Sequence, residues 1–140
     1  MLTRLLILGV LTVAVATGYG LLRLWQRRRV QTLGHAALAL PIAVASQIVS
    51  GRAAVLAFST ASCAECRTRQ APALARLRAR LGDDVAVVSL DALDHSDLVA
   101  QFGILTVPST VVLSESHQVL HLNLGYTSDA RLAEQLAESQ

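Results

Sequence analysis

An uncharged, mostly apolar run occupies residues 5–22 and is bracketed by Arg4 and Arg23. It is 18 residues long, and a helix of about 20 residues crosses the ~30 Å hydrocarbon core of a bilayer. The run is apolar on all faces, unlike a helix that packs one face on a soluble domain. Trp25 follows, where an interfacial aromatic side chain is expected. The pattern predicts one N-terminal transmembrane helix, with residues 1–29 as the anchor and its basic flank.

A cleaved signal peptide is the alternative for this segment. The sequence at residues 14–16, Ala-Val-Ala, resembles a cleavage site. The apolar run continues beyond it, however, and then meets four closely spaced arginines, Arg23, Arg27, Arg28 and Arg29. We therefore interpret the segment as an uncleaved, single-pass anchor in the cell membrane.

The arginines around the span also predict its orientation. Four follow the span and only Arg4 precedes it. The positive-inside rule therefore predicts that the C-terminal part of the chain faces the cytoplasm. A periplasmic or extracellular position is the alternative.

Beyond residue 52 the chain alternates between short apolar runs and amphipathic stretches. Strands are predicted at residues 53–58, 85–90, 109–113 and 119–124. Helices are predicted at residues 66–81, 94–102 and 128–138. We expect the first two strands to pair in parallel through a right-handed crossover, and the last two to form an antiparallel hairpin. The pattern thus predicts an α/β fold.

Some local features refine these boundaries. Residues 30–52 are expected to form a linker and the start of the domain, with a strand or turn within the apolar stretch 36–49. Pro72 should kink the first helix, because it lacks an N–H group and clashes with the preceding turn. Asp94 and Ser128 are the expected N-caps of the second and third helices.

Charge is distributed unevenly along the chain. Residues 1–52 carry six arginines and no acidic residue, a net +6, whereas residues 53–140 carry six arginines and ten acidic residues, a net −4. No arginine cluster is interleaved with aromatic residues, so binding to nucleic acid is not expected. The arginines at residues 67–80 indicate a solvated helix face paired with acids such as Asp83 and Asp84. A surface that contacts anionic lipid headgroups or an acidic partner is the alternative.

Cys63 and Cys66 are the only cysteines, and they follow the first predicted strand at the start of the first predicted helix. Two thiols at this spacing can close and reopen a disulfide. The helix N-terminus should favour the thiolate of Cys63. A zinc site would need two more ligands, and none of the four histidines has a suitable spacing. Arg67 rather than His follows Cys66, which excludes covalent haem attachment. A structural disulfide is an alternative, although so small a loop stabilises little.

Residues 53–140 resemble the thioredoxin family. Cys63-Ala64-Glu65-Cys66 matches the family's redox pair, and Arg67 matches a basic residue that often follows it. Val107-Pro108 resembles the family's cis-proline loop, and Gly125 resembles the glycine ahead of the last helix. The resemblance implies a thioredoxin-like three-layer domain, with a central mixed sheet flanked by helices. The layout is similar to that of membrane-tethered bacterial thioredoxin-like proteins.

The resemblance also implies a thiol–disulfide oxidoreductase. Cys63 would attack as a thiolate and Cys66 would resolve the mixed disulfide. The substrate-facing loops would be shaped by Val107, Pro108 and Gly125. Implied partners are protein thiols and disulfides, an unidentified electron donor and, through residues 5–25, membrane lipid. No cofactor beyond the Cys63–Cys66 disulfide and no metal is implied.

Three hypotheses about the function are open. A domain in the cytoplasm would act as a reductase, and an exported one would reduce apocytochromes during cytochrome c maturation or other envelope thiols. A non-catalytic, thioredoxin-like interaction module is the third. It is favoured by the loss of two family features and disfavoured by the retention of both cysteines.

The chain departs from the family pattern at several positions. Ser62 replaces the usual Trp before the first cysteine, and Ala57 replaces a buried acid that commonly accepts the proton of the resolving thiol. Glu65 should disfavour the thiolate of Cys63, and with Ser62 it fits a capping box, S-x-x-E. Pro72 lies six residues after Cys66 rather than the usual five.

Overall fold

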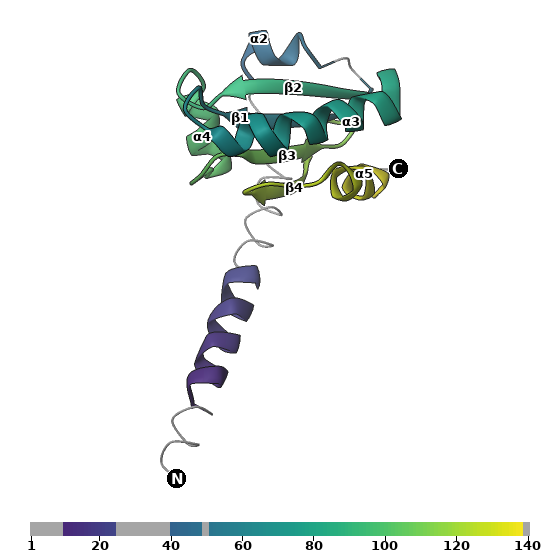
Figure 1. Cartoon of the computed structure of the whole chain (residues 1–140). Coiled ribbons are helices and arrows are strands. Elements are labelled where there is room, and N and C mark those ends of the chain that lie inside the picture. The colour runs from purple at the N-terminus through teal and green to yellow at the C-terminus, as the bar shows by residue number, and fades with distance from the viewer. Residues whose placement is uncertain (1–9, 25–39, 49–50, 139–140) are drawn as a thin grey trace.

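The computed structural model describes residues 10–24, 40–48 and 51–138. Its domain is built on a four-stranded sheet with the strand order β2-β1-β3-β4 (Figure 1). β1 pairs in parallel with β2 and antiparallel with β3, and β4 pairs antiparallel with β3. The predicted parallel pair and the predicted hairpin are therefore confirmed. The strands are β1 Ala53–Ser59, β2 Val85–Asp91, β3 Ser109–Leu113 and β4 Val119–Leu124.

Helices lie on both faces of the sheet, which makes the domain three-layered (Figure 1). A cluster of buried hydrophobic side chains lies on each face of the sheet. Alternate residues of β1 point to opposite faces, as the period of two in a strand requires. Leu56 and Phe58 pack with α4 (Ser96–Phe102) on one face, where the Phe58 and Phe102 rings meet edge to face with centroids 6.0 Å apart. Val55 and Ala57 pack with α3 (Ala71–Leu81) and α5 (Asp129–Ala137) on the other. The predicted mixed sheet flanked by helices is confirmed.

A short helix, α2 (Ile42–Ala45), occupies the segment where a strand or turn was predicted. The carbonyl of Pro41 accepts hydrogen bonds from the N–H groups of Val44 (2.8 Å) and Ala45 (2.9 Å), which closes the first turn. Proline before a helix suits this arrangement, because its own missing N–H would have no partner there. Val44 and Ile48 lie four residues apart and are both buried in the α4-side cluster. The apolar spacing is thus that of a helical turn.

The helix that follows the cysteines changes its hydrogen-bonding pattern partway. Residues 64–65 are α-helical, Cys66–Gln70 form a π-helical segment, and α3 continues to Leu81. The N–H of Ala71 donates to the carbonyl of Cys66, five residues back. Pro72 therefore lies in the first turn of α3, where a missing N–H is tolerated, rather than in a regular helix interior. The wider turn accommodates the extra residue between Cys66 and Pro72.

The ends of α3, α4 and α5 show how each helix is capped. Gly82 ends α3 with a positive φ of 56° and begins the 3₁₀ turn Gly82–Asp84. Ser128 caps α5 by accepting a hydrogen bond from the N–H of Arg131 (3.3 Å), as predicted. The prediction for Asp94 is wrong, because α4 begins one residue later than that cap requires and His95 occupies the cap position without a side-chain hydrogen bond.

Residues 10–24 are helical. Within the three described ranges, no helix is long and apolar enough to cross a membrane. Residues 5–9 of the predicted span, Trp25 and the predicted linker at residues 30–35 lie outside the described residues.

Candidate active site

Cys63 and Cys66 form a disulfide, with their Cα atoms 5.3 Å apart. β1 ends at Ser59, and the N–H of Cys63 then donates to the carbonyl of Thr60 (3.1 Å), which turns the chain into the helix. Cys63 is half-buried immediately before the helix, and Cys66, one turn in, is only 5% exposed. The predicted position of the pair, after the first strand and at the start of the first helix, is confirmed.

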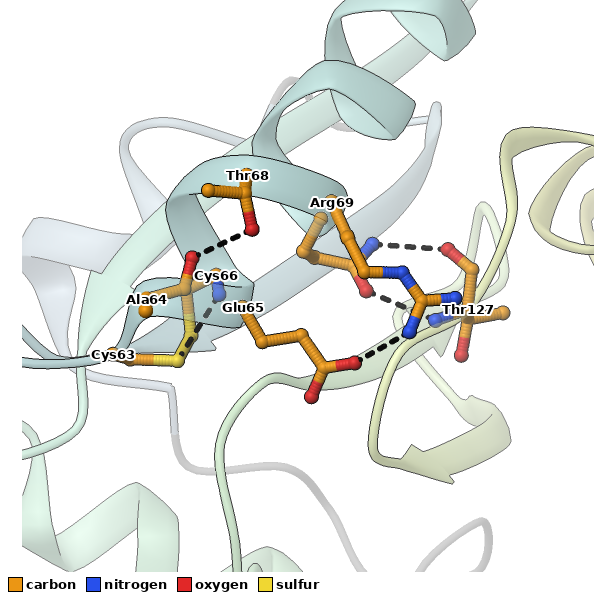
Figure 2. Close-up of polar contacts among 8 residues, drawn as sticks. Cys63, Ala64, Glu65, Cys66, Thr68, Arg69 and Thr127 are labelled. Atoms are coloured by element: carbon orange, nitrogen blue, oxygen red, sulfur yellow. Dashed lines mark hydrogen bonds and ion pairs between the residues drawn. A yellow bond between two sulfur atoms is a disulfide. The ribbon is translucent and has the colours of Figure 1, made fainter.

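The sulfur of Cys63 itself caps the helix. The N–H of Cys66 donates to Cys63 Sγ over 3.1 Å, the contact that an N-cap side chain makes three residues ahead (Figure 2). Unpaired N–H groups and the helix dipole concentrate partial positive charge at this end. After reduction, the same donors would favour the thiolate of Cys63 over the thiol.

The predicted capping box does not form. Among the described residues, no hydrogen bond joins Ser62 to Glu65, and the Ser62 hydroxyl lies 3.4 Å from Thr60 Oγ1 instead. The reason is the register, because Cys63 rather than Ser62 occupies the cap position. Glu65 is then one residue short of the position that a capping box requires. Its carboxylate pairs with Arg69 over 2.8 Å (Figure 2).

Arg67, the basic residue after the cysteine pair, folds back over the preceding loop. Its guanidinium donates to the carbonyl of Ala61. The contact joins the first helical turn to the segment that leads into Cys63.

The Val107–Pro108 peptide bond is cis, as predicted. Pro108 precedes β3, and the register pairs Phe58 with Ser109, so Pro108 lies beside the end of β1. Ser109 also pairs with the last residue of β4, which brings Gly125 to the same place. The N–H of Gly125 donates to the carbonyl of Pro108 over 2.8 Å. The loop that carries Cys63, the cis-proline loop and Gly125 thus lie together at one edge of the sheet, the edge at which β1 and β4 end and β3 begins.

Two contacts that the sequence did not predict connect the helix of the cysteines to the loop after Gly125. The Gln70 side chain, 3% exposed, donates through Nε2 to the carbonyl of Thr127 (3.1 Å) and accepts through Oε1 from its N–H (2.9 Å). The Arg69 guanidinium lies over the ring of Tyr126, 4.1 Å from its centroid. Gln70 lies at helical spacing from the apolar residues Cys66, Leu74, Leu77 and Leu81. A polar residue in this series is the signal that could have indicated a buried hydrogen bond.

A pocket of about 130 Å³ lies beside Cys66. Ala57 lines it from β1, at the position where the family resemblance led us to expect an acid. In the described part of the chain no carboxylate lines this pocket, whose polar side chains come from Ser59, Thr60, Arg67, Gln70 and Ser89.

The arginines of the helix face are paired differently from the prediction. Arg76 forms an ion pair with Asp129 of α5 (3.0 Å), and Arg78 donates to the carbonyl of Val87. Neither Asp83 nor Asp84 forms an ion pair with the described arginines, so the partners named in that prediction were wrong. Among residues 10–24, 40–48 and 51–138, no group of three or more His, Cys, Asp or Glu side chains is arranged to hold a metal ion.

Comparison with known proteins agrees with this geometry. The Thioredoxin family model matches residues 43–138. The chain belongs to the thioredoxin family. The thioredoxin of Alicyclobacillus acidocaldarius subsp. acidocaldarius is 31% identical over 93 residues, which cover 66% of this chain and 87% of that protein.

Solved structures show the same fold. A malarial protein superposes with a TM-score of 0.57 at 18% identity, covering 63% of this chain and 97% of its own. Thioredoxin-2, described as a component of the malaria parasite's protein secretion machinery, gives 0.54 at 19% identity, covering 59% and 80%. At these identities the likeness concerns the fold alone.

A thioredoxin domain with a closed cysteine pair supports thiol–disulfide oxidoreductase activity. Membership of the family implies that its substrates are protein thiols or disulfides.

Proposed function

We propose that this thioredoxin-family chain is a membrane-anchored reductase of protein disulfides, with Cys63 as the attacking thiol and Cys66 as the resolving thiol. The proposal rests on the position of Cys63. Cys63 is half-buried at a helix start and is hydrogen-bonded through its sulfur, at the sheet edge that also holds Pro108 and Gly125. A substrate that approaches this edge meets the first sulfur and not the second, because Cys66 is only 5% exposed.

The reaction consists of two exchanges. The Cys63 thiolate attacks one sulfur of the substrate disulfide, which forms a mixed disulfide and releases the other substrate sulfur as a thiolate that takes up a proton. Cys66 then loses its proton and attacks Cys63 Sγ, which closes the Cys63–Cys66 bond and releases the second substrate thiol. The substrate gains two electrons and two protons, and the pair loses them. A thiol or dithiol electron donor must reduce the pair before the next cycle.

Membrane anchoring is supported by the exposure of the N-terminal helix. Large apolar side chains point outward along residues 10–24, from Val10 at 69% exposed to Leu24 at 56%. A helix that exposes apolar side chains on all sides is unfavourable in water and suits a lipid environment. With the uncharged run extending from residue 5, the segment reaches the length that a bilayer requires.

The direction of the reaction follows from the proposed orientation. The four arginines after the span favour a domain on the cytoplasmic side, by the positive-inside rule. The cytoplasm keeps thiols reduced, so a redox pair there is supplied with electrons and acts as a reductase.

Reduction of insulin disulfides tests the activity. The full chain, purified in a mild detergent and supplied with dithiothreitol, should accelerate insulin reduction at least tenfold over the Cys63→Ser variant. The Cys66→Ser variant should turn over slowly, because it lacks the resolving thiol. Equal rates for the wild type and Cys63→Ser, with Cys63 unreactive toward alkylating reagents, would favour a non-catalytic interaction module.

The anchor and its orientation are tested separately. Alkaline carbonate should leave the full chain in the membrane pellet and detergent should release it, whereas release by carbonate contradicts an integral anchor. A phosphatase that is active only outside the cytoplasm, fused after Gln140, should be inactive. Activity of this fusion would place the domain outside and favour an exported reductase.

A further inference from the structure

Glu65 lies between the two cysteines, and its side chain is turned aside. Figure 2 shows the Glu65 side chain extending toward Arg69, away from the sulfur of Cys63. The Arg69 guanidinium donates to Glu65 Oε1 over 2.8 Å, one helical turn further along. A free glutamate at this position could approach Cys63, and its negative charge would oppose the formation of a second negative charge there.

Arg69 has a second contact, with Tyr126. Its guanidinium lies over the Tyr126 ring, with the central carbon 4.1 Å from the ring centroid. The neighbouring Gln70 holds Thr127 through two hydrogen bonds, which fixes the backbone next to Tyr126. Because a planar guanidinium can stack on a ring and bind a carboxylate at the same time, an arginine can make both contacts, whereas a lysine is a flexible point charge.

We propose that Arg69 is a positioning residue, which holds the Glu65 carboxylate against the Tyr126 side of the helix and so keeps it from opposing the Cys63 thiolate. The inference rests on the proposed function, in which Cys63 is the attacking thiol. The Glu65–Arg69 pair is about half exposed and contributes little to folding. Its effect is therefore on the reactivity of Cys63.

Other charged groups at this edge have their own contacts. Arg67 donates to the carbonyl of Ala61. Asp91, which pairs with Ser59 at the end of β1, accepts a hydrogen bond from the N–H of Leu93 (2.8 Å). Among the described residues, Glu65 is the acidic side chain within the cysteine motif, and Arg69 is the cation that pairs with it.

The test measures alkylation of Cys63 by iodoacetamide as a function of pH, in the full chain with Cys66→Ser so that one thiol reacts. Arg69→Gln should slow alkylation at pH values below the midpoint about two- to fivefold and move the midpoint to higher pH, as expected for an unopposed charge at an exposed site. Arg69→Lys should give an alkylation profile between that of Arg69→Gln and that of the chain with Arg69. Arg80→Gln removes the same charge from the far end of the same helix and should leave the profile unchanged.

The double variant Glu65→Gln/Arg69→Gln separates action through Glu65 from a direct effect of the arginine charge. If Arg69 acts through Glu65, the double variant recovers the profile of Glu65→Gln alone. If Arg69→Gln slows alkylation equally in the Glu65→Gln background, or if Arg80→Gln slows it as much, the inference is wrong. Insulin turnover is not needed for this readout, so a shifted profile in a chain that fails to reduce insulin would reject the proposed function and keep the role of Arg69.

Discussion

The side-chain amide of Gln70 pairs with the backbone of Thr127 as a strand residue would, donating to its carbonyl over 3.1 Å and accepting from its N–H over 2.9 Å. Both residues are buried, and they lie 57 positions apart in the sequence. The contact connects the π-helical segment that begins at Cys66 with the loop that begins at Gly125. It therefore joins the segment that begins at Cys66 to the loop at the sheet edge where Pro108 and Gly125 meet.

Replacement of Gln70 by leucine should destabilise the domain and loosen this edge. Gln70→Leu leaves the Thr127 N–H and carbonyl buried without partners, which costs about 1–3 kcal/mol each at most. Gln70→Glu keeps an acceptor for the N–H but buries a carboxylate against the Thr127 carbonyl oxygen, so near neutral pH it should cost at least as much as Gln70→Leu. Urea unfolding measures the stability, and insulin kinetics should show a raised KM. An unchanged urea midpoint for Gln70→Leu would show that the pair contributes nothing.

Gly125→Ala should reduce both stability and substrate binding. Gly125 has a φ of 90°, and a Cβ added there would meet no atom within 4 Å, so the cost arises from the backbone conformation. We expect a loss of about 1–2 kcal/mol.

Gly51→Ala is the matched control for this substitution. Gly51 also has a positive φ, 81°, with open space around a Cβ, but it lies in the turn before β1. Both variants should unfold at lower urea concentration, and only Gly125→Ala should raise KM for insulin. A raised KM in both would show that the effect is not specific to Gly125 and would contradict its role at this edge.

Ala57→Asp should accelerate the second exchange at the expense of stability. The side chain would enter the pocket of about 130 Å³ beside Cys66, where a carboxylate can accept the proton of the resolving thiol. A positioned base typically contributes about 10²- to 10⁴-fold in rate, while burial of the new carboxyl lowers the urea midpoint. Ala57→Asn has nearly the same shape without the basic group. Stopped-flow kinetics measure the rate at which the mixed disulfide is resolved. Equal rates for Ala57→Asp and Ala57→Asn would show that proton transfer does not limit that step.

The strands and the positions of the site residues could be predicted from the sequence, because they depend on local pattern. Residues 85–88 and 111–113 are continuously apolar, as expected for strands that lie between two layers, and β3 is buried along its whole length. Cys63, Pro108 and Gly125 each stand next to a strand end, so once the strands are placed, their meeting at one sheet edge follows.

The features that the sequence did not predict depend on register or on tertiary contacts. Moving the helix cap by one residue, from Ser62 to Cys63, was enough to exclude the capping box. Arg69 was read as one arginine of a solvated face, and its contact with Tyr126 joins segments that are far apart in the chain. No local pattern encodes such a contact, although the polar Gln70 in an apolar series was a visible indication.

In the proposed mechanism, Cys63 attacks a substrate disulfide and Cys66 resolves the intermediate. The most direct measurement is the mass of the covalent adduct formed when the full-length Cys66→Ser protein, reduced beforehand, is mixed with insulin. We expect an insulin chain disulfide-bonded to Cys63, which dithiothreitol releases, and no adduct for the Cys63→Ser/Cys66→Ser protein. Absence of an adduct on Cys66→Ser, or an adduct of equal yield on Cys66 in the Cys63→Ser protein, would contradict it.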